Sequence, residues 1–249
     1  MLRRYHPAMT TRPARRRSLR SAPALSRGLL ALAALGLVAA LAACSGDDDE
    51  EGAGEVPDDF SAEQCLVRVH GRSDTGAPPT MVDGYAELAP DANEPFDGGG
   101  RVWIYDTEES AGAARNQVLE VIDAAGCEQV VLHGFSNGAA FVAALVCDGE
   151  TFDGRLVGAV VDDPVTDDSS PDCAPADGVA TAVYWTGGLT EGVAGASCED
   201  LGWTCAGGDE LVGIDEFARR LGAEVQPSPF DEHRPYLEAP ELTDWLTAS

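Results

Sequence analysis

A serine flanked by glycines is the residue of this chain best suited to covalent chemistry. Ser136 is the centre of the sequence Gly-Phe-Ser-Asn-Gly at 134–138. The β-branched run 129–133 before it predicts a strand, and the small residues 139–146 after it predict a helix. A strand–turn–helix of this kind holds a serine in a strained conformation, and small residues two positions away let the strand and helix approach. An ordinary glycine turn is the alternative, but the flanking elements favour a nucleophile.

A serine nucleophile needs a base, and the chain has only 4 histidines. One lies in an N-terminal segment that we expect to be removed, which leaves His70, His133 and His233. His70 and His133 each stand at the end of a predicted strand, where a structural hydrogen-bonding role is expected. His233 comes after the serine and after the last predicted strand, in the chain order that places the base last. We therefore predict His233 as the general base, with an exposed surface histidine as the alternative.

Missing residue types exclude several other chemistries. The 16 basic residues are all arginine, which excludes a phosphate-binding loop with its lysine, Schiff-base chemistry and serine–lysine pairs. Neither the spacing of a calcium loop nor a His-Glu-x-x-His pair occurs, so we expect no metal and no cofactor. The formal net charge of −27 repels phosphate backbones, and we therefore expect no binding to nucleic acid.

The elements that must position Ser136 and His233 alternate along the chain. Short β-branched runs are separated by stretches of helical periodicity, which is typical of a parallel sheet covered by helices. Apolar residues spaced three and four apart predict amphipathic helices after Asp106, from Ile214 to Leu221 and after Pro240. The predicted strands are 66–70, 101–105, 129–133, 156–161, 180–185 and a weak one at 223–226.

From about Cys65 to its end, the chain resembles the α/β-hydrolase family in its GFSNG sequence, its order of elements and its His-Gly pair at 70–71. The resemblance implies an α/β fold, with a mostly parallel sheet and helices on both faces. The family's first strands are missing and no insertion is long enough for a lid domain, so we expect a small variant with an open site. The loops 72–100 and 187–208 are its expected walls, with Trp203 as a candidate aromatic contact.

The same resemblance implies where an oxyanion would be stabilised. In the family, a His-Gly pair follows the strand beside the nucleophile strand, and its loop donates a backbone N–H to the oxyanion. The segment Leu66–Arg72 (LVRVHGR) matches this pattern. The expected donors are the backbone N–H groups of Arg72 and of Asn137, the residue after the nucleophile. Both would point to the position where negative charge develops on the carbonyl oxygen.

The acid of the catalytic triad has three candidates. The resemblance places the acid after the strand 180–185, which makes Asp209 and Glu191 the main candidates and Asp163 the third. Asp209 has a valine three residues later and a helix shortly after, as the family often shows, and it lies 24 residues ahead of His233. We therefore predict Asp209 as the acid, preceded by an insertion that a disulfide closes.

The cysteines predict a disulfide-bonded, exported domain. Apart from Cys44, which the next paragraph assigns to a lipid, an even set of six remains, and such a set in an exported protein suggests three disulfides. The resemblance places the strands that follow Cys65 and Cys127 side by side, so these two are expected to pair. The expected disulfides are Cys65–Cys127, Cys198–Cys205 across a short loop and, as the remaining pair, Cys147–Cys173.

The first 43 residues have the character of an export signal. They contain eight arginines and no acid, and their apolar run 29–43 has 15 residues, fewer than the roughly 20 that span a bilayer. The run ends in Leu-Ala-Ala-Cys, which resembles a bacterial lipobox with Cys44 as the acylated mature N-terminus. Residues 44–61 are expected to be an acidic tether and 62–249 the hydrolase domain. Both the Sec and the twin-arginine export routes are compatible with the segment.

These features predict a serine hydrolase that cleaves carboxylic esters through an acyl-enzyme on Ser136. The lidless layout is similar to carboxylesterases and to feruloyl and polyhydroxyalkanoate esterases. Two alternatives stay open, namely an envelope acyltransferase with the same triad and a non-catalytic surface lipoprotein with a hydrolase fold. We expect a monomer that acts on an ester substrate and is held by its N-terminal lipid at the outer face of the membrane.

Overall fold

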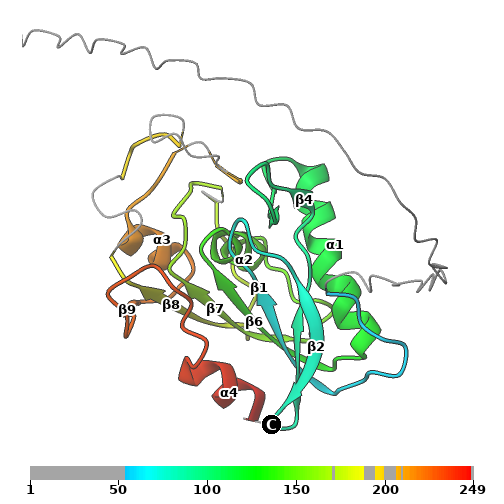
Figure 1. The fold of residues 1–249 in the computed structure, drawn as a ribbon. Helices are drawn as coiled ribbons and strands as arrows, with labels where there is room; N and C mark the ends of the chain where they lie inside the picture. The colour runs from blue at the N-terminus through cyan, green and yellow to red at the C-terminus, as the bar shows by residue number, and fades with distance from the viewer. Residues whose placement is uncertain (1–53, 170–171, 188–193, 199–205, 209, 248–249) are drawn as a thin grey trace, which may run out of the picture. The chain divides into compact units, whose positions relative to one another are not determined.

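The centre of the molecule is a mostly parallel β-sheet (Figure 1). The structure is a computed structural model that describes residues 54–169, 172–187, 194–198, 206–208 and 210–247. Among these residues, the main sheet has the strand order β2-β3-β1-β6-β7-β8-β9, and every neighbouring pair is parallel except β2 with β3. The strands are β1 (Gln64–Val69), β2 (Ala77–Val82), β3 (Tyr85–Ala89), β6 (Gln129–Phe135), β7 (Leu156–Asp162), β8 (Ala180–Trp185) and β9 (Val225–Pro227).

Different helices cover the two faces of this sheet. The first face packs on α1 (Glu108–Ala125), α2 (Asn137–Cys147) and α3 (Ile214–Arg220). The second face packs on α4 (Pro240–Thr247), which lies below the sheet in Figure 1. Alternate strand residues serve the two faces: Val67, Leu132 and Val161 are buried on the first, and Leu66, Val131 and Val160 on the second. The predicted α/β fold with helices on both faces is confirmed.

The ends of α1 show why the chain becomes helical where it does. Thr107 caps the helix, because its hydroxyl accepts a hydrogen bond from Ser110 N at 3.1 Å while Ser110 Oγ accepts one from Thr107 N at 2.9 Å. The helix ends at Gly126, which adopts a left-handed conformation with φ of 69°. In contrast, α2 lacks a side-chain cap at its start, and all of its residues are buried. Its stability therefore comes from packing in the core.

Two features of the sheet differ from the sequence-based expectation. The segment 101–105 was predicted to be a strand of the sheet, and this is wrong: only β5 (Arg101–Val102) is extended, and it pairs with β4 (Glu94–Pro95) in a separate two-stranded sheet. The antiparallel hairpin of β2 and β3 was not predicted. It follows β1 in the chain and extends the sheet beyond β1, whereas no strand precedes β1 in the described part.

Two of the three expected disulfides are present. Cys65–Cys127 joins the start of β1 to the turn before β6, and Cys147–Cys173 ties the end of α2 to the loop before β8. Cys198 is also disulfide-bonded, and its expected partner Cys205 lies outside the described residues. The parallel pairing of β1 with β6 confirms the arrangement from which the first pair was expected.

The N-terminal predictions fall on residues that the structure does not describe. The signal segment 1–43, the lipobox Cys44 and most of the tether 44–61 lie there. Within the described part, no helix has the length and apolar character needed to cross a bilayer.

Candidate active site

Ser136 occupies the sharp turn between β6 and α2. The strand ends at Phe135 and the helix begins at Asn137, which leaves the serine with φ of 55° and ψ of −116°. A residue other than glycine with a positive φ has a strained backbone, and such strain persists only where the surrounding structure enforces it. Here Ser136 N donates to Asp162 O at 3.1 Å, and Ser136 O accepts from Ala140 N at 3.1 Å. The predicted nucleophile therefore sits at the strained turn that the sequence indicated.

The two glycines of the GFSNG sequence are required by close packing. A Cβ added at Gly138 would lie 2.2 Å from Val69 O and 2.4 Å from His70 O, so α2 could not approach β1. A Cβ added at Gly134 would lie 2.6 Å from Gly138 O. Any larger residue at either position would push the helix away from the sheet and move the serine.

The turn after β1 lies against the serine. A Cβ added at Gly71 would be 3.4 Å from Ser136 Cβ, so the His-Gly pair borders the nucleophile as expected. The backbone N–H groups of Arg72 and Asn137 have no hydrogen-bond acceptor among the described residues. Both N–H groups therefore remain candidates for binding a substrate oxygen.

The side chain of Asn137 has a role that the sequence did not reveal. Its Oδ1 accepts from Trp103 N at 2.9 Å, and its Nδ2 donates to Trp103 O at 3.1 Å. The indole Nε1 of Trp103 in turn donates to His70 O at 3.1 Å. Because Asn137 and Trp103 are both buried, these bonds fix the predicted oxyanion turn against the start of α2.

His70 also holds this turn, in agreement with the structural role expected for it. Its Nδ1 lies 2.7 Å from Gly71 O, and its Nε2 accepts from Ala92 N at 3.3 Å. One ring nitrogen donates and the other accepts, which requires a neutral imidazole with its proton on Nδ1. Burial lowers the pKa of His70 from its ordinary value, and this favours the same neutral form.

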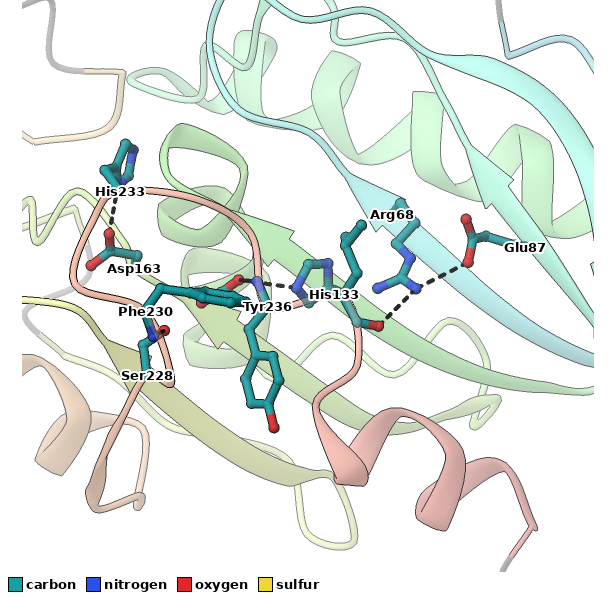
Figure 2. A network of polar contacts seen from close by, with 10 residues as sticks. Arg68, Glu87, His133, Asp163, Ser228, Phe230, His233 and Tyr236 are labelled. Atoms are coloured by element: carbon teal, nitrogen blue, oxygen red, sulfur yellow. Dashed lines mark hydrogen bonds and ion pairs between the residues drawn. The ribbon is translucent and has the colours of Figure 1, made fainter.

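His233 is paired with Asp163 (Figure 2). Its Nδ1 lies 2.5 Å from Asp163 Oδ2, and the carboxylate also accepts from Thr186, from the side-chain hydroxyl at 2.7 Å and from the backbone N–H at 3.1 Å. The side chain of Asp163 is fully buried, and burial alone would raise its pKa. The hydrogen bonds from His233 and Thr186 outweigh burial and hold the pKa below its ordinary value. The carboxylate therefore stays ionised and orients the imidazole.

The imidazole of His233 lies beside the strained turn. Its ring stacks on the ring of Phe135, the residue before the nucleophile, with 4.6 Å between centroids. The side chain is 28% exposed, as expected of a group that must meet a substrate. Ser136 Oγ makes no hydrogen bond with the described residues, and such catalytic hydrogen bonds often tighten only when a substrate is present.

The predicted acid requires a different account. Asp209 and Glu191 both lie outside the described residues, as does the candidate wall residue Trp203. The carboxylate that the structure brings to His233 is Asp163, the third candidate. Since one Nδ1–H donates one hydrogen bond, Asp163 fills the position that Asp209 was predicted to take. A topological signal pointed to it, because Asp163 follows β7, the strand next to the nucleophile strand.

The fold and this site together define the α/β-hydrolase architecture: a mostly parallel sheet with a serine at a strand–helix turn and a histidine–aspartate pair at the same edge. No cluster of histidine, cysteine and acidic side chains suited to a metal ion occurs among the residues that the structure describes.

No protein-family model and no curated protein matches the chain. Among solved structures, it is similar to the Bacillus cereus carboxylesterase, with 16% identity, a TM-score of 0.45 and coverage of 79% of this chain and 91% of that one. A carboxylesterase from Mesorhizobium loti has 17% identity and a TM-score of 0.40, with coverage of 69% and 82%. TT1662 from Thermus thermophilus has 14% identity and a TM-score of 0.41, with coverage of 76% and 91%. The chemistry of the site therefore has to be argued from this chain's own residues.

Proposed function

We propose that the protein is a serine esterase that hydrolyses carboxylic esters, with Ser136 as nucleophile, His233 as general base and Asp163 as the acid of the triad. The observation that carries the proposal is the His233–Asp163 pair, whose imidazole stacks beside the strained turn of Ser136. A buried carboxylate on Nδ1 leaves the lone pair of the imidazole on Nε2, which is the form a general base needs.

In the first half of the reaction, Ser136 Oγ attacks the ester carbonyl carbon while its proton passes to His233 Nε2. The negative charge that develops on the carbonyl oxygen is stabilised by the N–H groups of Arg72 and Asn137. The bond to the alcohol oxygen then breaks, and the alcohol leaves with the proton from His233. In the second half, water attacks the acyl carbon and gives a proton to His233, which passes it to Ser136 Oγ as the bond to the acyl group breaks; the acid leaves and Ser136 is restored.

A fluorophosphonate probe tests this proposal without knowledge of the substrate, because it labels an activated serine. We expect stoichiometric labelling of the protein, loss of labelling in Ser136→Ala, and unchanged labelling in the control Ser110→Ala, whose serine lies in the first turn of α1. Hydrolysis of a short-chain aryl ester should follow the same order. Folded protein that is not labelled, or labelling that survives Ser136→Ala, would contradict the proposal.

We further propose that the chain is exported and anchored by a lipid on Cys44, on the strength of its lipobox-like sequence. Cys44→Ala should move the protein from the membrane fraction to the soluble fraction in a fractionation experiment. Unchanged membrane association of this variant would argue against the anchor.

A further inference from the structure

A second buried histidine–carboxylate pair lies close to the first (Figure 2). His133 Nε2 is 3.3 Å from Asp162 Oδ2, and the two side chains are 2% and 0% exposed. His133 belongs to β6 and Asp162 ends β7, so the pair joins the nucleophile strand to the strand that leads to Asp163. None of the proton transfers of ester hydrolysis passes through it.

The same carboxylate binds the loop that contains His233. We call residues 228–239, between β9 and α4, the histidine loop. Tyr236 N donates to Asp162 Oδ2 at 2.5 Å. One residue later, Leu237 O accepts from Arg68 Nη2 at 3.2 Å, and the same Nη2 donates to Glu87 at 3.0 Å. The sheet therefore binds the loop at two consecutive backbone groups, three and four residues after His233.

The groups that bind the loop come from three neighbouring strands. Arg68 lies on β1 directly opposite His133 on β6, and Asp162 ends β7 on the far side of β6. By the alternation of strand residues, all three side chains point to the face that α4 covers. In Figure 2, Arg68 and His133 lie next to each other, near Tyr236 of the histidine loop.

Burying charged and polar side chains such as these costs desolvation free energy, so they are a poor source of stability for the fold. Asp162 Oδ1 and Arg68 Nε and Nη1 are buried without a hydrogen-bond partner among the described residues. Burial lowers the pKa of His133, which indicates a neutral ring that donates from Nε2 to Asp162. Well-packed apolar residues are often as stabilising as buried ionic groups, or more so, and ionic groups then serve to specify one conformation.

We propose that Asp162 and Arg68 are positioning residues that fix the histidine loop, so that His233 stays between Asp163 and Ser136, and that His133 orients the carboxylate of Asp162. The proposal rests on the esterase function proposed above. Among the described residues, the ring of His233 itself is held only by Asp163 and by stacking on Phe135, and it is partly exposed, so its position also depends on the backbone of the histidine loop.

The variant Asp162→Asn tests the proposal, because it removes the charge that binds Tyr236 N and His133 while keeping the size of the side chain. A misplaced base costs rate rather than substrate affinity, so kcat for an aryl ester and the rate of fluorophosphonate labelling should both fall roughly 10- to 100-fold. KM should stay within about twofold of the unmodified protein.

A double-mutant cycle separates positioning from general damage. In a His233→Ala background, no imidazole remains to be positioned, so adding Asp162→Asn should leave the residual rate unchanged. If Asp162 instead supports the turn at Ser136, the variant should lower the rate equally in both backgrounds. That result, or an unaltered kcat for Asp162→Asn alone, would overturn the proposal.

Tyr184→Phe is a matched control. It removes the 2.7 Å hydrogen bond from the Tyr184 hydroxyl to Glu241 on the same face of the sheet, and it keeps the ring that packs edge-on against Tyr236 of the histidine loop. We expect a wild-type kcat. Should Asp162→Asn fail to fold, Arg68→Lys, whose shorter side chain lacks the Nη2 that binds Leu237 O, is judged by the same cycle. Failure of the unmodified protein to react with the probe would count against the esterase function itself, whereas equal reaction of the unmodified protein and both variants would count against positioning alone.

Discussion

The buried carboxylate of Asp167 is expected to make stability depend on pH. It is 3% exposed and accepts a hydrogen bond from the Tyr105 hydroxyl at 2.9 Å. Burial raises its pKa from 3.8 to about 6, although hydrogen bonds, including those from Ser169 and Tyr105, oppose the rise. The folded protein thus binds a proton more tightly than the unfolded chain does. The ionised form is therefore the destabilised one, and the contribution of Asp167 to stability falls as pH rises toward and through 6.

The expected magnitude follows from the two pKa values. A shift of about two units corresponds to roughly 3 kcal/mol in total, lost between acid pH and pH values above 6. Because the unfolded carboxyl is already mostly ionised at pH 5, about 1.4 kcal/mol of this total is expected between pH 5 and 8. Asp167→Asn keeps an acceptor for Tyr105 and cannot ionise. Relative to the unmodified protein, this variant should gain about 1.4 kcal/mol over that range.

Urea unfolding of both proteins at pH 5 and pH 8 measures this difference directly. The control is Asp168→Asn, which alters the next residue, a partly exposed carboxylate paired with Arg220. The control should not show the same gain between the two pH values. A constant difference between Asp167→Asn and the unmodified protein at both pH values would refute the reasoning.

Three further predictions concern the candidate site and the contacts that stabilise the fold around it. Asp163→Asn should lower kcat by about 10⁴-fold in a folded protein, because an amide favours the wrong tautomer of His233, and Asp209→Asn should leave kcat nearly unchanged; stopped assays with an aryl ester measure both, and reversed penalties would restore Asp209 as the acid. Loss of the Cys65–Cys127 bond, which spans 62 residues, in a variant with both Cys65→Ala and Cys127→Ala should lower the free energy of unfolding by about 4 kcal/mol, seen as a lower urea midpoint; an unmoved midpoint would contradict it. Gly138→Ala should destabilise the fold by about 1–3 kcal/mol and abolish probe labelling, whereas Gly112→Ala, in open space on α1, should not reduce stability.

Local patterns predicted the parts of the fold that local forces determine. The alternation of β-branched runs and helical stretches located β1, β6, β7, β8 and β9, as well as the four helices named above. The GFSNG sequence located the strained turn at Ser136 because the glycine requirement arises within five residues, where β6 meets α2. His233 was chosen because few histidines competed with it and its position in the chain was informative, and the structure pairs it with the buried Asp163.

The segment 101–105 was misassigned because its hydrogen bonds are not local. Val102 and Trp103 are buried like strand residues, but the backbone of Trp103 is bound at both its N–H and C=O by the Asn137 side chain. A buried residue paired with a distant amide has the same apolar pattern as a strand. The hairpin of β2 and β3 did carry a local signal, the Asp83-Gly84 turn, whose two residues have φ of 49° and 97°.

Asp163, the carboxylate that pairs with His233, was ranked third because this pairing depends on neighbouring strands. Asp163 follows β7, and its carboxylate accepts hydrogen bonds from Thr186, which follows β8. Only the parallel pairing of β7 with β8 brings these two together with the histidine loop. The sequence favoured Asp209 by its spacing to a later helix, and spacing along the chain does not record which strand ends meet.

Asp162 and Asp163, adjacent in the chain, contact different partners, Tyr236 and His233. Asp162 is the last residue of β7, and its direction follows the alternation of the strand, whereas Asp163 lies just after the strand with φ of 48° and turns toward His233. Insertion or deletion of one residue between Leu156 and Asp162 would turn Asp162 to the other face of the sheet and displace the turn that holds Asp163, so both carboxylates would be misplaced at once. Natural variation in chain length should therefore be absent from β7 and be confined to connecting loops, such as the Asp83-Gly84 turn, whose length the positions of these carboxylates do not depend on.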